Sequence, residues 1–463
     1  MQSVDEQFVA LTKKGVQCYG YEYDFTTTIS EFVESQGNKV AGRVLEIDGE
    51  ALKATVGDAT ATIKVSFEHN DHNTALLSLF RPGDIVGCEG EWKNDSRRFI
   101  CRQVTLLTKT RVEYGLPDSR DNQLKLKHLL YINDNNSAKT IFKRSETIRL
   151  IRDYLYTKGF NEIDTPLLHP FQGDSTSKPL FVSPSAYDDL QFTLASSPEL
   201  YLKKMLVSGF NKIFTINKVF RDEQIDNAHL MEFTSIEYYM AYVDYRYMMN
   251  FTEKLLKNLA SKVVGKKQLP FNGNIIDFNK PWARMSIHKT LKKHFGKDIF
   301  KLSYKELLEL AKTVDITYEN PTSSGNIIID IFESLYLHTL IQPTFIYDFP
   351  KDASVMCYDI TMAKDSRENN LLLERFELYI GGMELANCYS ELNDPEVQKK
   401  AFDNFLKQRN KELNMDATFY HALRVGMPPA SGVGFGIDRL LMILTDNAII
   451  TEVAPFSTYH ESL

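Results

Sequence analysis

The sequence predicts an α+β protein of more than one domain, with a small β-barrel followed by a larger domain. Residues 38–108 alternate apolar and polar side chains over short runs that end at Asp-Gly and Gly-Asp turns, as the short strands of a closed barrel do. From Lys143 a helical pattern is followed by strands, and a mostly helical stretch separates two strand-rich blocks. We therefore expect a barrel domain at 1–110, a connector at 111–140, and an α+β domain at 141–463 with a helical insertion at about 246–340.

Length and composition exclude several classes of protein. A chain of 463 residues is too long for one ordinary core. No window reaches the roughly 18 apolar residues of a membrane span, and the N-terminus lacks the apolar core of a signal peptide. The five cysteines show no Cys-x-x-Cys spacing, which argues against a disulfide framework and a structural zinc site. The net charge of −7 does not favour wholesale capture of nucleic acid, although a local basic face is compatible with it. We expect a cytoplasmic protein without a membrane partner.

The stretch "FTINKVFRDEQIDNAHLMEFTSIEYYMAYVDY" predicts a hairpin that carries an unusual amount of chemistry. Arg221 offers a planar fork that suits a carboxylate or a phosphate. His229 could reach a further phosphate, and Phe233 could offer its ring face to a purine. A salt-bridged hairpin with core aromatic residues would explain each of these residues equally well.

A second cluster lies in "RFELYIGGMELANCYSELNDP". Glu377 and Glu384 flank a Gly-Gly pair, which predicts two antiparallel strands with both carboxylates on one face. Paired carboxylates suit Mg²⁺ shared with substrate phosphates, although two solvated acids are the commoner reading of such a pattern. Asn387 and Glu391 are polar residues in an apolar neighbourhood, and a buried glutamate needs a cationic partner.

The third cluster is "PPASGVGFGIDRLLMIL". Glycines at 432, 434 and 436 alternate along a predicted strand, which lets a flat group approach the backbone. Arg439 follows at the start of an apolar helix, where it could stack on a ring or contact a phosphate. The spacing matches neither a Rossmann nor a Walker loop.

Taken together, the clusters resemble the three signature motifs of class II aminoacyl-tRNA synthetases. The first motif resembles "KRSETIRLIRDYLYTKGFNEIDTP", the second "VFRDEQIDNAHLMEF" and the third "GVGFGIDRLLM". "SPELYLKKMLVSGF" and "ELANCYSELNDP" are similar to the lysyl-tRNA synthetases in particular, and the resemblance extends to the N-terminal barrel. It implies an OB-fold anticodon-binding barrel, a catalytic domain built on an antiparallel β-sheet, and a homodimer formed through the first motif.

The resemblance also implies a reaction and the residues that carry it. Lysine is activated with ATP and Mg²⁺ and passed to tRNA, whose anticodon meets the barrel and whose acceptor end meets the catalytic domain. Arg221 and Arg439 are the catalytic candidates, and Glu377 and Glu384 the metal ligands. The ATP site would comprise Arg221, Glu223, His229, Phe233, Glu377 and Arg439. The lysine site would comprise Glu199, Arg221, Glu237, Tyr239, Asn387, Tyr389 and Glu391.

The sequence departs from that family at several positions. Asp174 replaces a glycine, and Ala195 replaces an arginine. Ala228, Leu230 and Met231 stand where the family has Arg, Asn and Pro. The base-reading side chains of the barrel are not recognisable. Two other readings therefore stay open: a relative that lysylates a protein side chain or a small amine, and a non-enzymatic regulatory or nucleic-acid-binding relative.

Overall fold

The computed structural model describes residues 4–24, 27–93, 98–112, 115–170, 178–187, 190–318, 323–351, 372–401 and 416–457. The chain divides into two compact units, Met1–Phe142 and Lys143–Leu463. Over the described ranges, none of the helices combines the length and the apolar composition that crossing a bilayer requires. Four cysteines are free thiols, and Cys357 lies outside the described residues.

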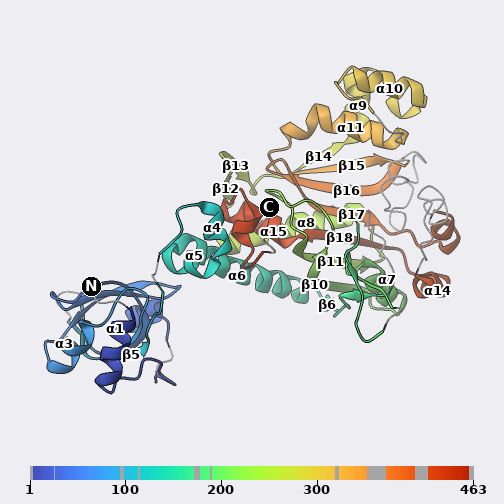
Figure 1. The fold of residues 1–463 in the computed structure, drawn as a ribbon. Helices are drawn as coiled ribbons and strands as arrows, with labels where there is room; N and C mark the ends of the chain where they lie inside the picture. Colours follow the sequence, from blue (N-terminus) through green and yellow to red (C-terminus); the bar gives the residue numbers. More distant parts are fainter. Residues whose placement is uncertain are drawn as a thin grey trace. The chain divides into compact units, whose positions relative to one another are not determined.

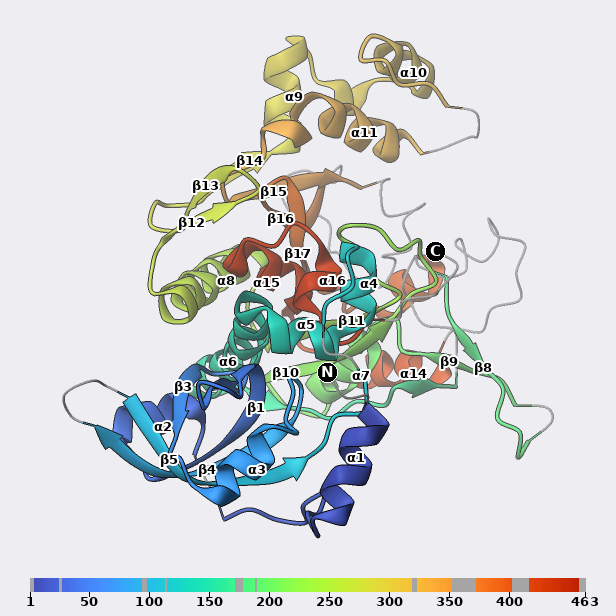
Figure 2. The ribbon, with the colours of Figure 1, turned by 60° about the vertical axis from the view of Figure 1, so that its left-hand side comes forward.

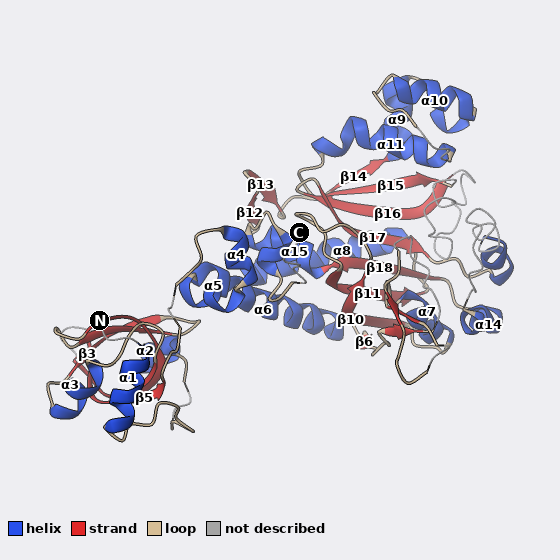
Figure 3. Ribbon diagram, in the orientation of Figure 1, coloured by secondary structure: helices blue, strands red, loops and turns tan. Residues whose placement is uncertain are grey.

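The first unit contains the barrel that the alternating pattern predicts (Figures 1 and 3). The sheet closes in the order β1-β2-β3-β5-β4, with β1 pairing both β2 and β4. Inward residues such as Val40, Val56 and Phe99 are fully buried, as expected where every second side chain fills a small barrel. The strands and helices of the barrel are β1 (Lys39–Asp48), β2 (Lys53–Gly57), β3 (Thr62–Phe67), β4 (Ile85–Lys93), β5 (Arg98–Thr108), α1 (Val4–Lys13), α2 (Ile29–Ser35) and α3 (Asp71–Leu77).

The stretch at 111–140 contains more regular structure than a polar connector. It holds α4 (Arg120–Lys125), α5 (Lys127–Asn133) and the first residues of α6 (Asn135–Thr157), so the helix expected from Lys143 begins earlier. The Ser119 hydroxyl accepts a hydrogen bond from the Asn122 N–H and caps α4. Leu124 and Leu130 are buried. Two buried leucines and an N-cap thus accompany short helices in this stretch. Its apolar residues recur too irregularly for the sequence to predict those helices.

The second unit is built on an eight-stranded sheet in the order β14-β15-β16-β17-β18-β11-β10-β6 (Figure 1). Its inner strands are antiparallel, and β14–β15 and β6–β10 are parallel pairs at the two ends. The strands are β6 (Asn161–Glu162), β10 (Lys212–Phe220), β11 (Glu232–Ala241), β14 (Ala283–Ser286), β15 (Thr344–Pro350), β16 (Leu372–Ile380), β17 (Met383–Ser390) and β18 (Ala430–Gly436); β7 (Leu168–His169), β8 (Phe181–Val182) and β9 (Phe192–Leu194) form a separate small sheet.

One face of the large sheet is apolar and covered by helices. Tyr238, Val433, Phe435, Phe376 and Leu378 point to this face and are buried. They pack in one core with helices α6, α8 and α15, because successive strand residues alternate between faces and these strands place every second apolar residue here. The covering elements include α8 (Tyr245–Leu259), α15 (Ile437–Thr445), α16 (Ile450–Val453) and the π-helical turn η1 (Ala260–Val264).

On the opposite face, the helices that the structure describes pack toward the two ends of the sheet. Near β10 and β11, α7 (Glu199–Val207) and α14 (Ala417–Gly426) share a core with Tyr239 and Ile213. Near β15 and β16, the insertion packs against Ile346 and Tyr379. The strip formed by β11, β18 and β17 lies between these two groups of helices.

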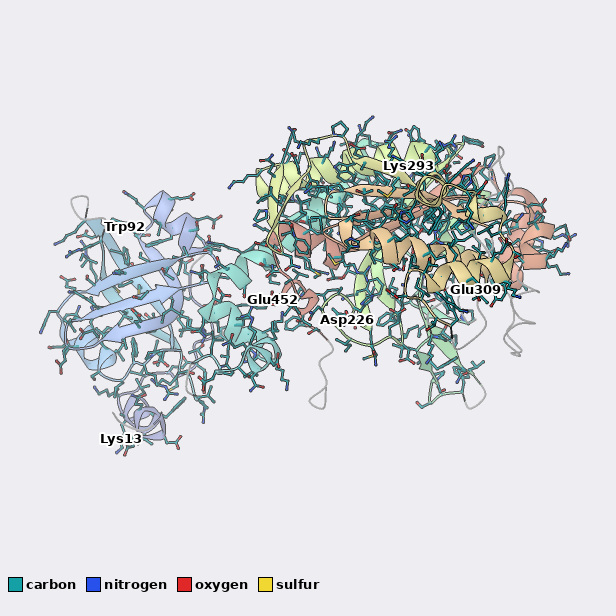
Figure 4. The ribbon with its side chains drawn as sticks, turned by 90° about the horizontal axis from the view of Figure 1, so that it is seen from above. Lys13, Trp92, Asp226, Lys293, Glu309 and Glu452 are labelled. Atoms are coloured by element: carbon teal, nitrogen blue, oxygen red, sulfur yellow. The ribbon has the colours of Figure 1, made fainter. Side chains whose placement is uncertain are left out.

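The insertion at about 246–340 is mostly helical but also contains strands. The β12–β13 hairpin and β14 interrupt it, because Asn272 and Gly273 form a left-handed turn between alternating apolar residues. Figure 2 shows α9, α10 and α11 gathered at one end of the sheet, and Figure 4 labels Lys293 on α9 and Glu309 on α10. Its elements are β12 (Gln268–Phe271), β13 (Asn274–Asp277), α9 (Ile287–Phe295), η2 (Ile299–Lys301), α10 (Tyr304–Lys312), α11 (Ser324–Tyr336) and η3 (Leu337–Thr339).

A buried ion pair connects three elements of the second unit. Arg144 on α6 donates to Asp438 on α15 at 2.5 Å and to the Thr234 hydroxyl on β11 at 2.7 Å. The other Asp438 oxygen accepts from the Thr234 N–H at 2.7 Å. Both charged side chains are less than a tenth exposed. Each charge has several partners, which is the condition under which a buried pair is tolerated.

We predict that Arg144→Met destabilises the second unit by about 3–5 kcal/mol, because it leaves the buried Asp438 carboxylate without its cation. Denaturant unfolding followed by tryptophan fluorescence measures the change. Lys312→Met is the matched control, because Lys312 pairs with Glu309 on the surface of α10. That control should cost less than about 1 kcal/mol. Equal losses in the two variants would contradict the assignment.

Candidate functional site

The register of the sheet brings most of the predicted site residues to one face. Tyr239 pairs with Gly432, Gly432 with Tyr389, and Tyr389 with Arg375. The next row of pairs runs from Glu237 through Gly434 and Asn387 to Glu377. Directly paired residues share a face, and so do residues two apart on one strand. The residues on this face are Arg221, Phe233, Glu237, Tyr239, Gly432, Gly434, Gly436, Glu384, Asn387, Tyr389, Arg375 and Glu377.

A β-bulge and a Gly-Gly turn make this alignment possible between β16 and β17. Gly381 and Gly382 have positive φ angles of 65° and 78°, as a two-residue hairpin turn requires. Tyr379 pairs with Glu384, but the register then shifts so that Glu377 pairs with Asn387. The extra residue turns Asn387 onto the face that already holds Glu384. The expectation that Glu377 and Glu384 share a face is confirmed.

The glycines of β18 provide a low floor in the middle of this face. A methyl group placed on Gly432 would lie 2.2 Å from the Tyr239 ring and 2.7 Å from Glu391 Oε1. A methyl group on Gly434 would lie 3.3 Å from the Glu237 side chain. Side chains from the neighbouring strands therefore lie close to the backbone of β18, as its alternating glycines predict. Gly432 is required for steric reasons.

Three carboxylates and a phenol gather beside this floor. The Tyr239 hydroxyl donates to Glu237 Oε2 at 3.0 Å, and the Ser197 hydroxyl donates to Glu237 Oε1 at 3.1 Å. Glu391 lies immediately after β17 and is 2% exposed. Glu199, the first residue of α7, is 6% exposed. These are the residues predicted to hold the ammonium groups of lysine.

A lysine that the sequence analysis did not single out lies among these acids. Lys203 is fully buried on α7 and forms ion pairs with Glu199 and, at 2.7 Å, with Glu391 Oε2. Burial by itself lowers the pKa of Lys203, but the two carboxylates outweigh this effect and the net pKa lies above its ordinary value. Lys203 therefore stays charged. Its i,i+4 spacing from Glu199 was the available sequence signal.

Glu237 and Glu391 hold their protons more tightly than free carboxyl groups. Burial, and after it the Glu199 carboxylate, raises the pKa of Glu237 to about 7. Burial also raises the pKa of Glu391, while the ammonium of Lys203 opposes that rise. Burial and then the three carboxylates raise the pKa of Tyr239. A cluster of this kind favours a cationic ligand, because a cation restores the ionised state of the acids.

Arg221 and Asn387 present polar atoms without a hydrogen-bond partner. Among the described residues, Arg221 Nε and Asn387 Oδ1 are buried and have none. Such atoms are costly unless a ligand or water completes them. The Arg221 guanidinium lies over the Phe233 ring, with Cζ 5.4 Å from the ring centroid. Strand β10 ends at Phe220, so Arg221 begins the loop between β10 and β11, and Glu223 lies within that loop rather than on the strand.

Arg439 connects the loop between β10 and β11 to strand β17 through hydrogen bonds. Its guanidinium donates to the Ala228 carbonyl at 3.2 Å, to the Glu384 carbonyl at 2.8 Å and to His229 Nε2 at 2.7 Å. His229 Nδ1 contacts both oxygens of Asp226 at 2.9 Å, so the proton belongs on Nδ1. Figure 4 labels Asp226 on this loop. Arg439, His229 and Asp226 form a chain that sets the position of the loop over the face.

Glu377 already has internal partners. Arg375 donates to Glu377 Oε1 at 2.6 Å, and the Tyr379 hydroxyl donates to Oε2 at 3.1 Å. Arg375 also lies over the rings of Phe349 and Tyr389. Among the described residues, no group of three or more His, Cys, Asp or Glu side chains could hold a metal ion by itself. Glu377 and Glu384 supply oxygen ligands of the kind Mg²⁺ takes when substrate phosphates complete its shell.

Several departures from the family pattern fall on backbone contacts or in the core. Ala228 meets Arg439 through its carbonyl, and Met231 accepts from the Arg221 N–H. Leu230 is buried in the main core of the second unit. Ala195 is fully buried. Asp174 lies outside the described residues.

Comparisons with known proteins agree with the geometry. The model of the family described as tRNA synthetases class II (D, K and N) matches residues 119–460. The chain is 35% identical to the lysine–tRNA ligase of Saccharolobus solfataricus, with 96% of this chain and 94% of that protein covered. It is 37% identical to the lysine–tRNA ligase of Methanoculleus marisnigri, with 96% and 92% covered. It is 34% identical to the lysine–tRNA ligase of Carboxydothermus hydrogenoformans, with 97% of this chain and 96% of that protein covered. With this fold, this site face and these matches, the chain belongs to the class II (D, K and N) tRNA synthetases.

Proposed function

We propose that this protein is a lysine–tRNA ligase, which joins lysine to ATP to form lysyl-adenylate and then transfers the lysyl group to tRNA. The observation that carries this proposal is the buried cluster of Glu199, Glu237 and Glu391 beside the Gly432 floor. Full-length relatives named lysine–tRNA ligase support the same substrate. An uncharged side chain would leave three acids with Lys203 as the single cation described among them, so the cluster selects against it.

The amino acid lies across the floor between two sets of partners. Glu391, with Tyr239 and Glu237, receives the ε-ammonium, and Glu199 receives the α-ammonium. Tyr389 lies beside this group on β17. Arg221 Nε, which is buried and unpartnered among the described residues, donates a hydrogen bond to the carboxylate end, and Asn387 assists there with the N–H₂ group of its side-chain amide. The carboxylate then attacks the α-phosphorus of ATP, the bond from that phosphorus to the bridging oxygen breaks so that pyrophosphate leaves, and the Arg221 guanidinium stabilises the developing charge.

ATP binds along the loop between β10 and β11. Phe233 offers a ring face to adenine, and Arg439 and His229, which already contact each other, lie where they can reach the ring and the phosphates. Glu223 stands on the same loop. Glu377 and Glu384 would hold Mg²⁺ with substrate phosphates completing its shell, and the bound ion would neutralise phosphate charge. Arg375 balances Glu377 in the free protein.

The remaining assignments concern tRNA and assembly. The closed barrel of the first unit binds the anticodon, and the acceptor end reaches the sheet face of the second unit. The chain forms a homodimer through α6 and β6. β6 is the last strand of the large sheet, and the nearby Tyr156, Leu167 and Leu168 expose two-fifths or more of their surface. Exposed apolar side chains beside a sheet edge are typical of such an interface.

Purified protein should catalyse pyrophosphate–ATP exchange that requires both lysine and Mg²⁺, and it should charge total tRNA with lysine. Leucine is the control amino acid, and a lysine tRNA with an altered anticodon is the control acceptor. Exchange that leucine supports equally well would refute the substrate. Adenylate formation without any tRNA charging would favour a different acceptor, such as a protein side chain or a small amine.

The KM for lysine should fall as the pH rises from about 6 to about 8. Glu237, with a pKa near 7, and Glu391 bind cations only after losing their protons, so lysine binding strengthens as they ionise. Each group that titrates contributes up to about tenfold per pH unit. Glu391→Gln should raise the KM about tenfold or more at pH 8 and flatten the profile, while the KM for ATP stays within about twofold. A pH-independent KM in the unaltered protein would contradict the cluster assignment.

Sedimentation should show a dimer at micromolar protein concentration. Leu168→Glu should shift the protein toward monomer, because it places a charge on the apolar surface beside β6. Val425→Glu, at an exposed apolar position on α14, is the control and should remain dimeric. A monomeric unaltered protein would refute the interface.

A further inference from the structure

The buried Lys203 has no role in the reaction as proposed, yet it contacts two of the residues assigned to the substrate. It pairs with Glu199 on its own helix and with Glu391, which directly follows β17. A lysine that only stabilised α7 would need one carboxylate partner on that helix. It would not need a second partner next to β17. The contact with both carboxylates therefore connects Lys203 to the site and not only to the helix.

The geometry assigns one oxygen of each carboxylate to Lys203. Glu199 uses Oε1 and Glu391 uses Oε2. Glu391 Oε1 lies on the other side, 2.7 Å from where a methyl group on Gly432 would be placed. Glu391 thus faces Lys203 with Oε2 and the floor, where the amino acid is proposed to lie, with Oε1.

The charges of the cluster also come to a specific total. Glu199, Glu237 and Glu391 carry three negative charges when ionised, and Lys203 carries one positive charge, which leaves −2. Lysine brings two ammonium groups to this cluster, while Arg221 faces its carboxylate. We infer that Lys203 is a positioning residue that sets the net charge and the orientation of the acidic cluster to match the two ammonium groups of one diamino acid. This inference rests on the proposed function.

The other charged and titratable groups around Glu391 do not replace Lys203. Glu199 lies on α7, Glu237 and Tyr239 lie on β11, and Cys388 lies on β17; each is neutral or negative and works against the ionised carboxylate. Arg221 acts on Glu237. Without Lys203, three acids would share the site without a buried cation, and Glu391 would hold its proton still more tightly in place of an ammonium group.

The test compares two variants. Lys203→Met keeps a long, unbranched side chain and removes its charge, whereas Lys203→Arg keeps the charge. Difference infrared spectroscopy of the free protein follows the C=O stretch of protonated carboxyl groups against pH and needs no ligand. Lys203→Met should move the titration of a buried carboxyl upward by about one pH unit or more, and Lys203→Arg should leave it near its original position. An unchanged titration in Lys203→Met would overturn the inference.

Kinetics provide the second readout. In Lys203→Met the KM for lysine at pH 7 should rise about tenfold, its pH midpoint should move upward, and the KM for ATP should stay unchanged. Equal losses of lysine and ATP affinity with no shift in midpoint would indicate a structural role only and would overturn the inference. A carboxyl shift in a protein that never activates lysine would refute the proposed function and leave the charge-setting role intact.

A compensated variant covers the case in which Lys203→Met does not fold. Glu199→Gln combined with Lys203→Met removes one charge of each sign and keeps the total at −2. Compared with Glu199→Gln alone, the pair should still show an upward shift of the Glu391 carboxyl, because only Lys203 differs. The absence of that shift would again overturn the inference.

Discussion

The site depends on the register of the strands from β11 to β16. Because side chains alternate between faces, a slip of one residue would send a whole strand's polar set into the core. The bulge between β16 and β17 is the sensitive point, since Glu384 precedes it and Asn387 and Tyr389 follow it. An unbulged pair of strands would put the metal candidates and the amino acid candidates on opposite faces. The one extra residue of the bulge therefore places the metal candidates and the amino acid candidates on the same face of the sheet.

A second constraint comes from burial, which makes every charge on this face expensive to leave alone. The protein balances most of them internally: Lys203 meets Glu391, Arg375 meets Glu377, and Asp226 reaches Arg439 through His229. These partners rigidify the site before any ligand arrives. The same reasoning explains Arg144, whose pair with Asp438 connects the motif 1 helix to the motif 3 helix below the sheet.

The sequence carried enough local information for the barrel, the Gly-Gly hairpin and the glycine-lined strand, because turns and period-two alternation act over a few residues. Resemblance supplied the order of the motifs and the candidate residues. Long-range partners could not be obtained in this way: Arg144 and Asp438 are 294 residues apart, and nothing near either one identifies the other. The bulge was equally hidden, since either register suits the local pattern. Lys203 carries no stronger sequence signal, because an i,i+4 pair with Glu199 is equally typical of an exposed helix surface.

The side chains of this face fall into two groups that respond differently to a ligand. Arg221 Nε and Asn387 Oδ1 are buried and without partners among the described residues, so a ligand group that meets them replaces no existing protein bond and recovers a desolvation cost already incurred. Arg439 and Glu377 are already bonded, so phosphates or a metal ion must share or displace His229 and Arg375. Under the proposed function, Arg221 is thus preorganised for the carboxylate of the amino acid, while the proposed nucleotide end would have to exchange contacts. If the proposed sites are correct, the amino acid carboxylate would meet Arg221 with little rearrangement, whereas ATP would use part of its binding energy to remodel the Arg439–His229 contact.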